Sequence, residues 1–254
     1  MSAAPTSLPP LRRQVVVPAG PQVAFDVFTQ QIGTWWPVDR HSVYGEKATA
    51  EFRDGRLIET SPDGEEAVWG TVLDWEPPWK LRITWHPGHS AERASEVEVS
   101  FSPVTDALTM VTLEHRGWER LTDPAAARDE YRNGWPTVLG GYASTIAATD
   151  ETDTGPVWLV LSYTPAPGVL RPFEHGGFRG HPAYLESLRE RGVLVAAGPF
   201  PASGEGMTVV RLDGPGEVAG LLESAYQQDT SVTDGVLEVR VRPWAVLVTG
   251  SSLP

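Results

Sequence analysis

The longest amphipathic pattern in the chain lies between Asp123 and Ala148. Its apolar residues recur at intervals of three and four, which is typical of a helix that packs on a hydrophobic surface. Thr122 or Asp123 can cap its start, and Pro124 fits the first turn, where no amide donor is needed. Pro136 lies inside the pattern and predicts a kink or a restart, because proline removes a helical hydrogen bond. The apolar stripe consists of Tyr131, Trp135, Val138, Leu139, Tyr142 and Ile146.

The sequence before this helix predicts one strand, one helix and then six further strands. Residues 12–17 are rich in β-formers, and residues 21–32 place apolar side chains on one helical side, with Gly33 ending the helix. Six short segments follow, separated by turn residues such as Asp54-Gly55, at the spacing of an antiparallel meander. We therefore expect an α+β domain in which a curved sheet closes around the long helix. The six segments are residues 48–52, 56–60, 67–75, 81–85, 96–101 and 108–115.

The pattern after the long helix predicts a second, smaller unit. Residues 149–156 are polar and poor in apolar side chains, as expected of an interdomain linker. Beyond them the elements follow in the order β-α-β-β-α-β, which is the ferredoxin-like split arrangement. Its elements are expected at residues 158–163, 180–191, 193–197, 207–212, 215–226 and 236–248.

Four segments are thus predicted along the chain. They are a disordered tail at 1–10, a first domain at 11–148, the linker at 149–156 and a second domain at 157–248.

Composition limits the classes of protein that this chain can represent. With 254 residues it is long enough for two domains with separate cores, and its net charge of −13 argues against nucleic acid or an anionic membrane surface as a partner. The absence of cysteine excludes disulfides, thiolate nucleophiles and cysteine-based metal sites. The chain starts without a secretory signal pattern, and no apolar segment approaches the roughly 20 residues needed to cross a bilayer, so we expect a cytoplasmic protein.

Five motifs of the first domain, taken together, are more specific than its strand count. They are Trp35-Trp36-Pro37, Trp69-Gly70-Thr71-Val72, the run EPPWKLRITW from Glu76 to Trp85, the run LEHRGW from Leu113 to Trp118, and Gly134-Trp135. In that order they resemble the bacterial homologues of the activator of heat-shock protein 90 ATPase, within the START/Bet v-like helix-grip (SRPBCC) superfamily. The resemblance covers residues 10–147. It implies a cavity between sheet and long helix, often for an apolar small molecule, and it supplies no universal catalytic residue.

A second set of motifs lies in the second domain. It consists of Phe178-Arg179-Gly180-His181 at a helix start, the run GVLVAAGPF from Gly192 to Phe200, Asp229 shortly before Gly235-Val236, and the tail VRVRPWAVL. These motifs resemble the YCII-related family. The resemblance implies an active site formed by His181 and Asp229, and a homodimer that forms through the sheet. Thr230 follows Asp229 where that family commonly has proline, which affects the local turn and the aim of the carboxylate.

His181 and Asp229 are accordingly the candidate catalytic residues. A histidine titrates near neutral pH, so a carboxylate partner can hold it as an acid or base for proton transfer. Arg179 and His175 are the candidate substrate-binding residues, since an arginine can hold an anionic group and a loop histidine can join a pocket. The alternative stays open that His181 only packs at a helix start and Asp229 is a solvated turn residue.

The tryptophans of the first domain provide the other candidate site. Eight of the ten tryptophans precede residue 150, and they can line an aromatic cavity with a few polar groups. Ordinary core packing is the alternative, because a buried tryptophan needs only one partner for its indole N–H. His115 is the candidate polar group, unless it bonds a backbone carbonyl. The candidate cavity residues are Trp35, Trp36, Trp69, Trp85, His115, Trp118, Trp135 and Tyr142.

Three functions follow from these sites, none of which requires a cofactor. His86 and His89 share one turn, but zinc takes three or four ligands and no third residue completes the set, so no metal site is predicted. The preferred function is binding of an apolar or aromatic small molecule in the first domain, whose resemblance covers more of the chain. The alternatives are a lyase or isomerase that acts on a small carbonyl or aromatic compound through His181 and Asp229, and a protein-binding regulatory or co-chaperone-like module.

Overall fold

A computed structural model gives the structure of residues 8–146, 155–200 and 203–249. The chain divides into two compact units, Met1–Asp150 and Glu151–Pro254. Most of the predicted tail at 1–10 and of the predicted linker at 149–156 lies outside the described residues.

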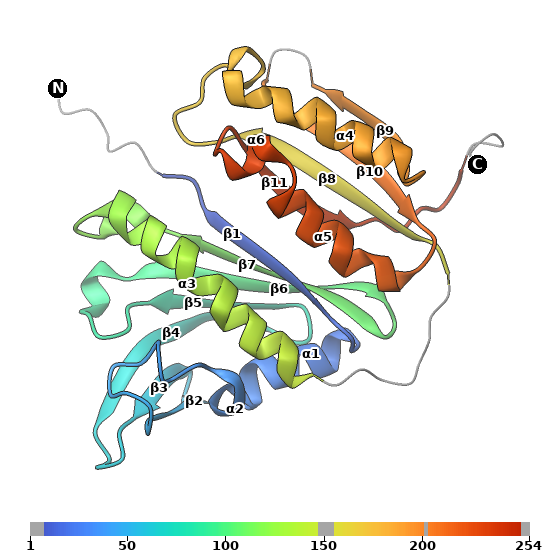
Figure 1. Cartoon of the computed structure of the whole chain (residues 1–254). Helices are drawn as coiled ribbons and strands as arrows, with labels where there is room; N and C mark the ends of the chain where they lie inside the picture. Colours follow the sequence, from blue (N-terminus) through green and yellow to red (C-terminus); the bar gives the residue numbers. More distant parts are fainter. Residues whose placement is uncertain (1–7, 147–154, 201–202, 250–254) are drawn as a thin grey trace. The chain divides into compact units, whose positions relative to one another are not determined.

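The first unit is built on a seven-stranded antiparallel sheet with the strand order β1-β7-β6-β5-β4-β3-β2. Figure 1 shows the long helix α3 lying across this sheet. The structure confirms the predicted α+β fold with a large antiparallel sheet and a long helix after it, which fits the helix-grip fold. The strands are β1 Leu11–Val17, β2 Thr49–Arg53, β3 Arg56–Thr60, β4 Glu66–Glu76, β5 Lys80–Trp85, β6 Ser95–Thr105 and β7 Leu108–Arg116. The helices are α1 Pro21–Gln30, α2 Ile32–Trp35 and α3 Pro124–Thr145, with 3₁₀ turns at Ala91–Arg93 and Trp118–Arg120.

The core of this unit lies between the sheet and its helices. Strand β5 shows the alternation that puts one face inward, because Leu81, Ile83 and Trp85 are buried while the residues between them are half-buried. Helix α3 packs its apolar stripe on the sheet, where Trp135 and Tyr142 are 3% and 0% exposed. The two faces together exclude water from a large aromatic core.

One local prediction in the first unit requires correction. Helix α1 ends at Gln30, and Gly33 lies inside the separate helix α2 instead of ending a helix. A Cβ atom at Gly33 would lie 2.9 Å from the carbonyl oxygen of Ala50, so glycine allows α2 to approach β2 closely.

Of the two outcomes predicted at Pro136, a kink or a restart, the restart does not occur, because helix α3 is continuous from Pro124 to Thr145. The carbonyl of Arg132, four residues before Pro136, loses its helical donor and accepts a hydrogen bond from Arg13 Nη2 at 3.0 Å instead. Asp123 caps the helix as predicted, since its Oδ1 accepts from the amide of Ala126 at 3.1 Å.

The second unit contains a four-stranded antiparallel sheet with the strand order β11-β8-β10-β9. Helices α4 and α5 lie on one face of this sheet (Figure 1), and the hydroxyls of Tyr184 and Ser224 join them at 3.1 Å. The strands are β8 Val157–Pro165, β9 Leu194–Pro199, β10 Gly206–Leu212 and β11 Leu237–Pro243. The helices are α4 Gly180–Glu190, α5 Val218–Gln227 and α6 Thr230–Thr233, with 3₁₀ turns at Pro172–Glu174, Gly176–Arg179 and Pro215–Glu217.

Two features of the second unit differ from the sequence prediction. Strand β11 ends at Pro243, so the final strand is shorter than residues 236–248. The short helix α6, which contains Thr230, was not predicted, because four residues are too few to show a helical period.

Candidate functional site

The first unit contains a cavity of about 820 Å³ beneath α3. Small-molecule sites in proteins have volumes of roughly 300–1,000 Å³, so this space is large enough for a ligand of several rings. Four tryptophans form much of its wall, and each is at most 8% exposed. They are Trp36 after α2, Trp69 on β4, Trp85 on β5 and Trp135 on α3.

The four tryptophan rings contact one another as well as the cavity. The ring of Trp36 lies 5.0 Å from that of Trp69 and 5.7 Å from that of Trp85. The ring of Trp85 lies 5.4 Å from that of Trp135. Aromatic pairs at such distances are favourable beyond simple burial of their area. The sheet, the loop and the helix therefore present one continuous aromatic wall.

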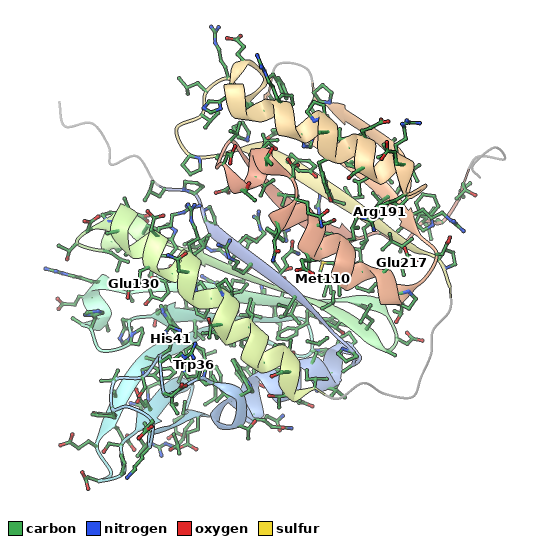
Figure 2. All side chains as sticks on the ribbon, in the orientation of Figure 1. Trp36, His41, Met110, Glu130, Arg191 and Glu217 are labelled. Carbon is green, nitrogen blue, oxygen red and sulfur yellow. The ribbon has the colours of Figure 1, made fainter. Side chains whose placement is uncertain are left out.

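Trp36 is fixed by the loop that follows α2. Its indole Nε1 donates to the carbonyl oxygen of His41 at 2.6 Å. In Figure 2 the labelled Trp36 and His41 lie next to each other, and Glu130 marks the α3 side of the cavity. Since the indole N–H is already satisfied, Trp36 presents ring surface to the cavity.

A buried carboxylate holds the loop at the mouth of the cavity. Glu59 on β3 is fully buried, and its Oε2 accepts from the Trp69 indole and from the amide of Val43, both at 2.8 Å. Its Oε1 accepts from the amide of Tyr44 at 2.9 Å and from the hydroxyl of Ser42 in a short contact. Four donors replace water around the two carboxyl oxygens, which lets this side chain be buried. Glu59 could not be singled out from the sequence, because a lone glutamate in a strand is usually exposed.

His115 lies behind the cavity wall and positions Trp135. Its Nδ1 accepts from the Trp135 indole at 3.2 Å, and its Nε2 lies 2.7 Å from the hydroxyl of Ser95. That hydroxyl in turn donates to the carbonyl oxygen of Trp85 at 3.1 Å, so Nε2–H must donate to it. Burial lowers the pKa of His115 to about 3, so the ring is neutral near pH 7 and does not act as an acid or base there.

The remaining predicted cavity residues pack in the core beside the cavity and do not line it. Trp35 donates through its indole to the carbonyl of Val27 at 2.9 Å. Tyr142 donates to the carbonyl of Ala24 at 2.8 Å. The ring of Trp118 lies 4.0 Å from that of His115. The residues that line the cavity and those that pack beside it are both mainly aromatic. Only the fold therefore distinguishes the two sets.

Two polar groups that the sequence did not single out for this cavity also line it. His86 is 7% exposed, and its Nδ1 lies 3.2 Å from the carbonyl oxygen of His89. The hydroxyl of Tyr131 accepts from the Trp85 indole at 2.9 Å, and burial raises the pKa of Tyr131, so this hydroxyl stays protonated. Tyr131 was recognised in sequence as part of the apolar stripe of the long helix, and its hydroxyl gave no separate signal.

The rim of the cavity carries charges of both signs. Arg40 and Arg93 are exposed there, together with three carboxylates from Glu92, Asp123 and Glu130. Among the described residues that line the cavity, none of the buried ones is an aspartate, glutamate, lysine or arginine. Charge is therefore confined to the entrance, and the interior is aromatic with a few neutral polar groups.

The second unit brings His181 and Asp229 together. His181 Nδ1 lies 2.7 Å from Asp229 Oδ2, and the two residues are 9% and 0% exposed. Asp229 Oδ1 accepts from the amide and the hydroxyl of Ser231 at 3.0 and 2.6 Å, which fixes the carboxylate. The carboxylate orients the imidazole and leaves Nε2 as the atom that can exchange a proton.

Thr230 occupies the first helical position of α6, directly after its N-cap Asp229. Proline is favoured at that position, and threonine is also compatible with it, so this departure from the YCII pattern leaves the Asp229 cap in place. A Cβ atom at Gly180 would overlap the side chain of Thr230, so glycine lets the start of α4 approach α6.

The two predicted substrate-binding residues lie near His181 in sequence but bond to neither His181 nor Asp229 in the described part of the chain. Arg179 and His175 are exposed, and in the described part of the chain no hydrogen bond connects either side chain to His181 or Asp229. His175 Nδ1 accepts from the amide of Gly177 at 3.2 Å and so caps its own 3₁₀ turn. The buried ring of Tyr163, 4.5 Å from that of His181, is the nearer neighbour.

Within residues 8–146, 155–200 and 203–249, no group of three or more histidine, aspartate or glutamate side chains is arranged to hold a metal ion. None of the helices there is long and apolar enough to cross a membrane.

The first unit thus belongs to a class of α+β domains in which a sheet and a long helix enclose a cavity. Residues 18–146 match the family described as Activator of Hsp90 ATPase homolog 1-like protein, and the chain belongs to this family. Comparison with curated proteins gave no match.

Similar solved structures each cover just over half of this chain. An anthrahydroquino-γ-pyrone synthase is 31% identical over 56% of this chain and 100% of its own, with a TM-score of 0.39. The self-sacrificing resistance protein CalC from Micromonospora echinospora is 26% identical over 56% of this chain and 98% of its own, with a TM-score of 0.45. An Hsp90 activator from Plasmodium falciparum is 20% identical over 54% of this chain and 95% of its own, with a TM-score of 0.40.

Proposed function

We propose that the first unit binds a small aromatic or apolar molecule in the cavity beneath α3. The observation that carries this proposal is the space of about 820 Å³ walled by four buried tryptophans. Burial of a planar ligand against these rings removes apolar surface from water on both partners. The charges at the rim leave the interior suited to an uncharged molecule, since an unpaired charge inside would lose its hydration without compensation.

Titration with 2-methoxynaphthalene, followed by quenching of tryptophan fluorescence, tests this proposal. The full chain is expected to bind the probe, and Trp135→Leu to weaken binding about tenfold, a loss of about 1.4 kcal/mol. Trp79→Leu is the matched control, because Trp79 is 52% exposed and does not line the cavity. Ala127→Phe, at a half-buried wall position, should block the space without removing a core ring. Equal binding by all four proteins would refute the proposal.

A second candidate function is acid–base catalysis in the second unit, as a lyase or isomerase acting on a small carbonyl or aromatic compound. The contact of 2.7 Å between His181 and Asp229 favours it, because both side chains are held for proton transfer at Nε2. Its identity as a YCII-type domain is likewise proposed, on the motifs around these two residues.

A panel of small carbonyl and aromatic compounds tests the catalytic candidate. Any turnover should fall at least about a hundredfold in His181→Gln and in Asp229→Asn, as expected when a general acid or base is lost. Glu174→Gln, in an exposed turn without an assigned role, should retain the activity. Turnover that survives both substitutions would place the reaction elsewhere.

A protein-binding role in regulation or co-chaperone action is the third candidate. Leu73, Trp75 and Trp79 are 40%, 42% and 52% exposed, and exposed apolar side chains are the kind that a protein partner can cover. A partner protein could contact these exposed side chains, whereas a small ligand would bind in a cavity that is enclosed on several sides. We therefore rank ligand binding ahead of it.

A further inference from the structure

His86 lines the aromatic cavity, and one of its ring nitrogens is buried without a hydrogen-bond partner in the described part of the chain. The carbonyl oxygen of His89 can only accept, so the His86 tautomer that carries its proton on Nδ1 fits the contact of 3.2 Å between these two atoms. The lone pair is then on Nε2, which is buried and has no hydrogen-bond partner among the described residues. A buried polar atom without a partner costs free energy, and a ligand that donates to it would recover that cost.

Tyr131 places a hydrogen-bond donor in the same cavity. Its oxygen already accepts from the Trp85 indole at 2.9 Å, which orients the hydroxyl and uses one lone pair. In the described part of the chain, no acceptor lies within hydrogen-bonding distance of the hydroxyl proton. The side chain comes from α3, whereas His86 follows β5, so the two groups approach the cavity from different elements.

These groups narrow the chemistry of the ligand. The four tryptophans favour a planar aromatic body, and the buried lining residues contain no charged side chain to pair with an ionic one. The acceptor on His86 requires a donor such as a phenolic hydroxyl, and the Tyr131 hydroxyl requires an acceptor such as a carbonyl oxygen.

We infer that the cavity selects an uncharged hydroxylated aromatic compound that also carries an acceptor oxygen. His86 Nε2 accepts from the ligand hydroxyl, and the Tyr131 hydroxyl donates to the ligand oxygen. This inference rests on the proposed function, because it names the ligand class of the same cavity. It also assigns a role to the histidine pair that the sequence offers only as an incomplete metal site.

A comparison of 2-naphthol with 2-methoxynaphthalene tests the role of His86 in the full chain. The two probes share a ring system, and only the first has a hydroxyl to donate. We expect 2-naphthol to bind at least about fivefold more tightly, as one additional hydrogen bond allows. His86→Phe keeps a ring of similar size and should remove this preference. His89→Asn is the matched control, because it keeps the backbone carbonyl that bonds His86 Nδ1 and should preserve the preference.

A second pair of probes tests the role of Tyr131. 2-Acetonaphthone carries an acceptor oxygen that naphthalene lacks, so Tyr131→Phe should lower the ratio of their affinities about fivefold. The ratio is informative because any change in packing around Trp85 affects both probes alike.

The outcomes separate this inference from the proposed function. Binding of all probes with ratios unchanged in His86→Phe and Tyr131→Phe would overturn the inference and leave the proposed function standing. Failure of every probe to bind the wild-type chain would overturn both.

Discussion

At the scale of single residues, histidines of similar appearance in sequence have different environments. His115 has partners for both ring nitrogens and is fully buried, whereas His86 has a partner only for Nδ1 among the described residues. His115 was predicted to be the polar group of the cavity, and of these two histidines His86 is the one that lines the cavity. Residue type and strand position cannot reveal this difference, because it depends on which backbone carbonyls and hydroxyls the fold brings to each ring.

The low pKa of His115 predicts that acid destabilises the first unit. In the unfolded chain its pKa returns to about 6.5, so the unfolded state binds the proton first as the pH falls. Stability is therefore full above about pH 6.5 and declines toward pH 3, by about 2 kcal/mol between pH 7 and pH 5.

Denaturant unfolding followed by tryptophan fluorescence measures this loss, since eight of ten tryptophans precede residue 150. His115→Gln should be less stable at pH 7, and its stability should change less between pH 7 and pH 5 by about 2 kcal/mol. Parallel curves for wild type and variant would contradict the assignment.

Replacing one side-chain oxygen of Glu59 by nitrogen is expected to lower the free energy of unfolding considerably. In Glu59→Gln the amide nitrogen cannot accept, so at least one of the four donors around the side chain loses its partner. We expect a loss of about 2–4 kcal/mol in the free energy of unfolding. Glu51→Gln on the neighbouring strand β2 is the control, because Glu51 is exposed and should change stability by less than about 0.5 kcal/mol. Similar effects of the two substitutions would argue against a structural role for Glu59.

At the scale of elements, the sequence predicted those features that depend on residues only a few positions apart. The strand at residues 56–60 and the cap at Asp123 agree with the structure, because turn residues and capping residues act within a few positions. The effect of Pro136 was not predictable from its neighbours. The carbonyl that it leaves without a helical donor is satisfied by Arg13, more than a hundred residues away in sequence.

Two adjacent glycines of α3 make a paired prediction. A Cβ atom at Gly141 would lie 2.9 Å from the carbonyl oxygen of Trp35, whereas none of the described neighbours comes within 4 Å of a Cβ at Gly140. Gly141→Ala should therefore destabilise the first unit by about 1–3 kcal/mol by forcing α3 away from α2. Gly140→Ala should be neutral or stabilising by up to about 1 kcal/mol, because alanine favours the helix. Thermal unfolding of both variants decides the matter, and a stabilising Gly141→Ala would refute the close approach.

At the scale of the whole molecule, the fold could be predicted from the sequence more completely than the site. The α+β character of the chain and its large antiparallel sheet followed from strand spacing and helix length. The sequence could not show which tryptophans line a cavity and which fill the core. Trp118 and Trp135, for example, are the same residue type and are similarly buried. Open space is a property of the packed molecule and leaves no pattern in the sequence.

We further propose that the chain forms a homodimer through the sheet of the second unit, as its YCII-like motifs imply. Met207 on β10 alternates with the buried Thr208 and lies on the face away from α4 and α5, where it is 38% exposed. Native mass spectrometry should show a dimer that Met207→Arg weakens, while Leu170→Arg in an exposed loop does not. A monomeric wild-type chain at micromolar concentration would exclude this dimer.

The measurement that tests the central claim most directly is the set of ten tryptophan indole N–H signals in a ¹⁵N–¹H correlation spectrum during titration with 2-naphthol. Ligand binding beneath α3 predicts that the signals of Trp36, Trp69, Trp85 and Trp135 shift together and saturate. The signals of Trp158 and Trp244 in the second unit should stay in place. A spectrum without shifts, or with shifts confined to tryptophans outside the cavity wall, would contradict ligand binding at this site.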